Sequence, residues 1–241
     1  MERTQIHHLA AAEHLSEALV YDNRRKNRRP AFTMQQTLQL QADGAWRSKR
    51  DWRAVGPERI ASETMTWRGG LVESTGEQPF LEEWTCAVPK GKGCACTLRS
   101  PKTGAQDRVR QLVLPHPAVT LASLPLLIAQ HWSTLSQGAA LPASYLVLKV
   151  QRAATVHLQR VAAAAGNERV IAATPANPVL RWIFGSTRCI FDADAPRLRR
   201  IEGLLDPRDL KPNGRWHEYL GTIEFTQPLD LSAMAAQGAQ R

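Results

Sequence analysis

The sequence contains no apolar run long enough for a transmembrane helix, which needs about 20 consecutive apolar residues. Its most hydrophobic stretch, residues 121–128, is short and is interrupted by Pro125. The first residues, from Met1 to Thr4, also lack the basic-then-apolar order of a secretory signal peptide. We therefore expect no transmembrane segment. We expect a cytoplasmic protein, or a periplasmic one if a signal peptide has been removed.

The sequence also lacks the local motifs of common catalytic sites. It has no Gly-x-Ser-x-Gly nucleophile motif, no Gly-x-Gly-x-x-Gly motif and no P-loop. Its acidic pairs, such as Glu82 with Glu83 and Asp206 with Asp209, lie at adjacent or turn positions, where carboxylates are usually solvated. We therefore predict no catalytic residue and no cofactor. An enzyme whose residues come from distant strands stays an alternative.

Cysteine is scarce, with four residues in the chain. Cys86, Cys94 and Cys96 flank a predicted turn, so a hairpin disulfide from Cys86 to Cys94 or Cys96 is expected in an oxidising compartment. Free buried thiols are the alternative. A zinc site would need a fourth ligand, and no histidine lies near these cysteines in the sequence. We therefore predict no metal site.

Negative charge is in deficit, with 22 Asp and Glu against 31 Lys and Arg, a formal net charge of +9. An excess of this sign attracts polyanions such as nucleic acid. Most of the basic residues are scattered, as on a solvated surface, and no common nucleic-acid-binding motif is present. The alternative function is therefore an interaction module that binds nucleic acid or an acidic partner through one basic cluster, Arg24, Arg25, Lys26, Arg28 and Arg29.

Alternating polar and apolar residues are the dominant pattern. In residues 31–41, Phe32, Met34 and Leu38 share one parity, and polar residues take the other, as in a half-buried strand. Turn signals such as Asp43-Gly44 recur about every ten residues, which is typical of an antiparallel meander. Strands are expected at 15–22, 31–41, 46–55, 58–67, 71–74, 80–88, 94–99, 108–114, 144–151, 155–163, 169–174, 189–192, 198–205 and 216–225.

One segment changes to a helical period. Between Ser123 and Ser136, apolar residues recur at steps of three and four, with Ser123 as the predicted N-cap, Pro125 in the first turn and Gly138 as the stop. A shorter helical turn is expected after Asn177. The predicted fold is mainly β with minor α, a curved antiparallel sheet or open barrel with one central helix. We expect a polar segment at 1–14, one domain at 15–228 and a flexible tail at 229–241.

The seven tryptophans are spread over nearly all of the predicted elements. Core packing is the simplest interpretation of each of them. One helix cannot cover the concave face of so many strands, however, so an apolar hollow between the sheet and the helix is expected. Its predicted ligand-binding residues are Phe32, Met34, Trp46, Trp67, Leu127, Ile128, Trp132 and Phe184.

The order of elements resembles the lipoprotein-carrier half-barrels of the bacterial envelope, the LolA and LolB-like proteins. The residues that carry the resemblance lie at 19–21, in the helix from 126 to Gly138, and at 145–150 and 198–203. The resemblance implies an open barrel that holds an acyl chain or another apolar ligand and performs no chemistry. The sequence thus predicts a non-catalytic binding or carrier protein for a lipid or other hydrophobic molecule.

Overall fold

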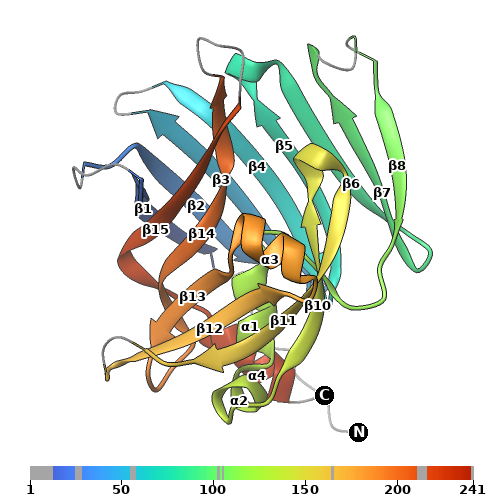
Figure 1. The fold of residues 1–241 in the computed structure, drawn as a ribbon. Coiled ribbons are helices and arrows are strands. Elements are labelled where there is room, and N and C mark those ends of the chain that lie inside the picture. Colours follow the sequence, from blue (N-terminus) through green and yellow to red (C-terminus); the bar gives the residue numbers. More distant parts are fainter. Residues whose placement is uncertain are drawn as a thin grey trace, which may run out of the picture.

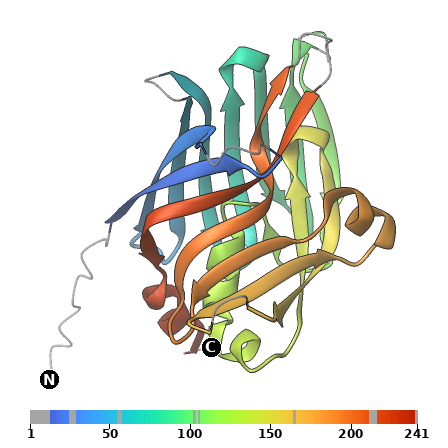
Figure 2. The same cartoon turned by 60° about the vertical axis from the view of Figure 1, so that its left-hand side comes forward.

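The computed structural model describes residues 13–24, 29–54, 58–101, 104, 106–163, 166–210 and 216–239. Its strands form one large sheet that curves into a trough without closing, and all neighbouring strands pair antiparallel except the ninth and tenth, which are parallel (Figures 1 and 2). A few helices accompany the sheet. The predicted fold class, mainly β with a curved open sheet, is confirmed.

The sheet contains fifteen strands. The first eight are β1 (Glu13–Asp22), β2 (Phe32–Leu40), β3 (Trp46–Ala54), β4 (Arg59–Arg68), β5 (Leu71–Gln78), β6 (Glu83–Lys90), β7 (Gly93–Arg99) and β8 (Arg108–Val113). The others are β9 (Ala118–Val119), β10 (Leu141–Val147), β11 (Arg152–Val161), β12 (Glu168–Pro175), β13 (Thr187–Asp192), β14 (Arg197–Leu210) and β15 (Trp216–Asp230). Short 3-10 turns follow two of them, η1 (Pro79–Leu81) and η3 (Leu148–Val150).

Two meanders meet where the first strand pairs with the last. β1 to β8 lie side by side in chain order, and β1 also pairs with β15, from which the sheet continues backwards through β14 to β9. Val20 lies opposite Phe32 on one side and Ile223 on the other. Gly221 permits this approach, because a Cβ there would lie 2.2 Å from the carbonyl oxygen of Tyr21. The two ends of the chain therefore share one interior.

Successive side chains of a strand point to opposite faces of the sheet, so every second residue points into the trough. In β2 and β3, alternate residues are buried, and directly opposed residues such as Met34 and Trp52 share the inner face. The same parity also buries polar side chains. Arg50 is only 1% exposed and lies between Trp46 and Trp52 along the inner face of β3. The interior is therefore not purely apolar.

Helix α1 (Leu124–Gln130) lies inside the curve of the sheet, with all residues except Gln130 buried (Figure 1). The predicted single helix is divided, because His131 leaves the helical region (φ −107°, ψ 28°) and α2 (Trp132–Ser136) follows. Ser123 occupies the predicted N-cap position, but its side chain makes no capping hydrogen bond. Its hydroxyl accepts a hydrogen bond from the Thr120 amide at 2.9 Å instead of capping the helix. No helix in the described ranges is long and apolar enough to cross a membrane.

Two segments expected to be irregular are ordered. The predicted flexible tail contains the end of β15 and helix α4 (Ser232–Ala239), which packs against α1. Leu231 and Met234 are buried, and Gly238 lies so close that a Cβ would stand 1.9 Å from the Gln130 carbonyl oxygen. Helix α4 consists mostly of small residues, so the hydropathy pattern of the sequence did not predict this contact. Residues 206–210, which lie between the strands expected at 198–205 and 216–225, are likewise a continuation of β14.

We predict that Met234→Ala lowers the free energy of unfolding by about 2–5 kcal/mol, the usual cost of truncating a buried Met. The reason is that Met234 is buried where a flexible tail was expected. Val113→Ala is the control, because Val113 is 84% exposed and should change stability by less than about 0.5 kcal/mol. Urea unfolding measures both variants. Equal effects would contradict the docking of α4.

Candidate functional site

The hollow predicted between sheet and helix is filled by side chains. Trp46, Trp67 and Met34 from the sheet and Leu127 and Ile128 from α1 are all buried in one apolar core. The core therefore occupies the place where the sequence predicted a ligand, and the simpler interpretation, core packing, describes these residues.

Two further predicted ligand residues also contact protein. Phe32 packs edge-on against Tyr219, with ring centroids 4.7 Å apart. Trp132 packs against Phe191 at 5.2 Å, and the Arg169 guanidinium lies 5.3 Å from its ring centroid. Neither Phe32 nor Trp132 lines the cavity described next.

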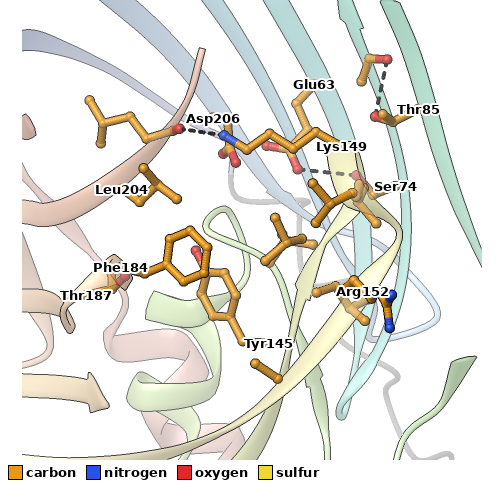
Figure 3. Close-up of a pocket in the computed structure, with 18 of the residues that line it drawn as sticks. Glu63, Ser74, Thr85, Tyr145, Lys149, Arg152, Phe184, Thr187, Leu204 and Asp206 are labelled. Atoms are coloured by element: carbon orange, nitrogen blue, oxygen red, sulfur yellow. Dashed lines mark hydrogen bonds between the residues drawn. The ribbon is translucent and has the colours of Figure 1, made fainter. Parts of the chain in front are cut away.

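A cavity of about 490 Å³ lies elsewhere on the concave surface, toward the end of the trough opposite α2 and α4 (Figures 1 and 3). Its walls come from β4, β5 and β6 on one side and from β10, η3 and β14 on the other, with helix α3 (Pro178–Phe184) at its border. This volume is in the usual range for small-molecule sites, roughly 300–1,000 Å³. Among the predicted ligand residues, only Phe184 lines it.

The cavity exists because small residues line a part of the trough. Alanine and glycine occupy wall positions on both sides, and larger apolar side chains complete the lining, among them Leu146, Leu148, Val156, Leu180, Leu204 and Leu205. Phe184 and Val150, which are 46% and 52% exposed, mark the opening. The interior is thus largely apolar and accessible from solvent.

Two glutamines join the walls. The Gln151 side chain is buried, and its amide nitrogen donates to the carbonyl oxygens of Cys96 at 2.7 Å and Arg108 at 2.6 Å. The Gln78 side chain bridges to β14, donating to the Asp206 carbonyl oxygen at 3.4 Å and accepting from the Arg208 amide at 3.1 Å. These bonds connect β7 and β8 to the start of β11, and β5 to β14. They make one enclosure from segments distant in sequence.

A row of polar side chains crosses the sheet beneath the cavity. Gln36, Arg50, Glu63, Gly76 and Thr85 lie directly opposite one another on successive strands from β2 to β6. Opposed residues share a face, and Glu63 and Thr85 of this row line the cavity. The signal in the sequence was that Arg50 shares the parity of Trp46 and Trp52, which face the core.

The opposite wall contributes further charges. Asp206 of β14 and Lys149 of η3 reach the same end of the cavity as Glu63 (Figure 3). The Lys149 ammonium pairs with Glu218 and donates to the Leu205 carbonyl oxygen at 3.5 Å. Nearby, four carboxylates face three cationic side chains, and we call these seven residues the charged cluster: Glu63, Glu83, Asp206, Glu218, Arg50, Lys149 and Arg208.

Burial shifts the pKa of two carboxyl groups of the cluster and of a neighbouring tyrosine. Loss of solvation, and secondly the nearby Asp206 carboxylate, raise the pKa of Glu63 to about 7, against the opposing effects of Arg50 and the Ser74 hydroxyl. Burial likewise raises the pKa of Asp206 and, well above its ordinary value, that of Tyr145. The cavity therefore contains one carboxyl group, Glu63, that holds a proton near neutral pH.

The predicted hairpin disulfide is contradicted by the strand register. Cys86 lies opposite Thr97, whereas Cys96 lies opposite Ala87, so Cys86 and Cys96 point to opposite faces of the sheet. All four cysteines are free thiols, and the Sγ atoms of Cys94 and Cys96 lie 3.4 Å apart on the inner face. Within the described ranges, no cluster of three or more His, Cys, Asp or Glu residues could hold a metal ion.

The predicted basic cluster falls between β1 and β2. Arg24 and Arg29 are exposed at the two sides of this connection, and the Arg24 amide donates to the Asp22 carboxylate at 3.0 Å. Arg25, Lys26 and Arg28 lie outside the described residues. Binding of nucleic acid or an acidic partner through this cluster stays a prediction.

Comparisons with protein-family models, with curated proteins and with solved structures find no match to this chain. The relation to the LolA and LolB-like carriers accordingly stays a prediction. Functional inference depends on the cavity and the charged cluster.

We predict that Glu63→Gln changes how stability depends on pH. In the wild type, the unfolded state releases the Glu63 proton near pH 4.5 and the folded state near pH 7, so stability falls as pH rises between these values. Gln does not titrate, so the variant should gain a few kcal/mol relative to the wild type from pH 5 to pH 8, at about 1.4 kcal/mol per pKa unit.

Urea unfolding at several pH values between 5 and 8 measures this difference. Glu224→Gln is the matched control, since the Glu224 side chain is exposed on β15 and should show no such pH dependence. A constant difference between Glu63→Gln and wild type across the range would refute the raised pKa.

Proposed function

We propose that this protein is a non-catalytic binding or carrier protein for a hydrophobic small molecule, which occupies the cavity between β4–β6 and β10–β14. The observation that supports it most is an apolar cavity of about 490 Å³ inside a domain that is otherwise closely packed. Small-molecule sites are usually concave, mostly apolar pockets in this range of volume, so the cavity supports a ligand-binding role.

The border of the cavity supports the same proposal. Helix α3 has no buried residue, although six of its seven residues are apolar or Pro. Leu180 and Phe184 line the cavity, while Val179, Trp182 and Ile183 are exposed beside it. A continuous apolar surface therefore leads from solvent to the cavity. Burial of apolar ligand surface contributes roughly 25 cal/mol per Å², which gives several kcal/mol for a few hundred Å².

The first test is native mass spectrometry of protein purified from its own host. A retained hydrophobic molecule of defined mass, released on denaturation, is expected. A molecule that is chemically converted on incubation with fresh protein would favour the enzyme alternative instead. Loss of any polyanion on raising the salt concentration would identify the interaction-module alternative.

We predict that Ala154→Trp lowers the affinity for Nile red, a neutral apolar dye, by about 10-fold or more. Ala154 lines the cavity and lies opposite Tyr145 on the same face, so an indole would occupy the ligand's space. Ala162→Trp, at the exposed position directly after β11, is the control and should bind the dye as the wild type does. Equal dye affinity in all three proteins would contradict the assignment of the cavity.

A further inference from the structure

The polar end of the cavity has hydrogen-bond acceptors without donors. Glu63 Oε2, Glu83 Oε1 and Asp206 Oδ2 are buried and make no hydrogen bond within the described part of the chain. All three residues line the cavity. Glu83 is 4% exposed, so water solvates it poorly. A buried acceptor without a partner is costly, which makes these oxygens a place for a ligand's donor groups.

The cationic donors beside these oxygens are already engaged, and Arg152, which also lines the cavity, lies apart from Glu63 and Asp206 (Figure 3). The Lys149 ammonium bonds to Glu218 and to a carbonyl oxygen, and Arg208 pairs with Glu83 and Glu218. Arg50 has two guanidinium nitrogens without partners, Nε and Nη1, but it does not line the cavity. What the polar end of the cavity offers to a ligand is therefore mainly carboxylate oxygen.

The charge balance of the charged cluster also favours a cationic ligand. The four carboxylates of the charged cluster outnumber its three cations by one, so the fully ionised cluster has one uncompensated negative charge. Burial makes such a charge unfavourable unless a proton or a cation neutralises it. A ligand with a positive head could supply the missing charge and donate to the free oxygens at the same time.

From this geometry we infer that the ligand is an amphiphile with a primary ammonium head. Its apolar part occupies the cavity, and its head donates hydrogen bonds to Glu63, Asp206 and Glu83. This inference rests on the proposed function, because it names the chemical class of the molecule that the cavity binds. An anionic head would meet the unpaired carboxylate oxygens and is disfavoured.

Binding of the ammonium head is coupled to release of a proton. Glu63 faces Arg50 of β3, Ser74 of β5, Tyr145 of β10 and Asp206 of β14. Asp206 in turn faces Lys149 of η3, Arg50, and Glu218 of β15. The proton that this carboxyl pair retains near neutral pH competes with the ammonium group. Affinity for an amine should therefore rise from pH 6 to pH 8, while affinity for a neutral alcohol should not.

The experiment compares three ligands with one tail, dodecylamine, dodecanol and dodecanoate, by displacement of Nile red from the full-length protein at pH 8. We expect dodecylamine to bind at least about 10-fold more tightly than dodecanol, as for a charge-assisted hydrogen bond, and dodecanoate to bind least. Glu63→Gln and Asp206→Asn should each reduce dodecylamine affinity about 10-fold and leave dodecanol affinity nearly unchanged. Glu224→Gln, an exposed change of equal charge, is the control.

The outcomes separate the two proposals. If none of the three compounds binds, the proposed function fails. If dodecanol or dodecanoate binds as tightly as dodecylamine, and Ala154→Trp blocks it, the cavity is a ligand site but the inferred head group is wrong. Retained dodecanol binding shows that a variant is folded. If a variant does not fold, the pH dependence of the wild type alone decides, since amine affinity independent of pH would overturn the inference.

Discussion

The trough depends on the pairing of β1 with β15. Among the described strands, this is the ladder through which the two meanders join, and it brings Val20, Phe32 and Ile223 onto one inner face. It unites segments from the two ends of the chain, so its contacts close a very long loop. Only when this pairing is made do the walls of β4–β6 and of β14 face the same interior. The cavity is therefore a property of the joined sheet and of neither meander alone.

The two ends of this interior are filled differently. At one end, the buried side chains of α1, together with Trp46 and Trp67, form an apolar core, and α4 packs against α1. At the other end, alanine and glycine line the walls, and the space they leave is the cavity. Side-chain volume along the strands thus determines where the interior is filled and where it leaves a cavity.

The charged cluster makes the polar end of the cavity unlike the apolar remainder. Arg50 and Glu63 oppose each other on β3 and β4, and Asp206 approaches them from β14. Burying these groups costs free energy, and a cost of this kind is typically retained where a protein binds or reacts. The same groups explain why an apolar cavity would select one head group. Electrostatic complementarity supplies selectivity, while apolar burial supplies most of the affinity.

Local patterns in the sequence determined the strands, most of the turns, the helix near the middle of the chain and the mainly β fold, because burial on one face imposes a period on neighbouring residues. They also placed Arg50 and Glu63 on buried parities, a signal that the sequence interpretation did not use. The tertiary structure alone decided that the predicted hollow is core, that residues from 206 to 210 continue a strand, and that Glu63 meets Asp206. These outcomes depend on contacts between residues far apart in the chain, which leave no period in the sequence.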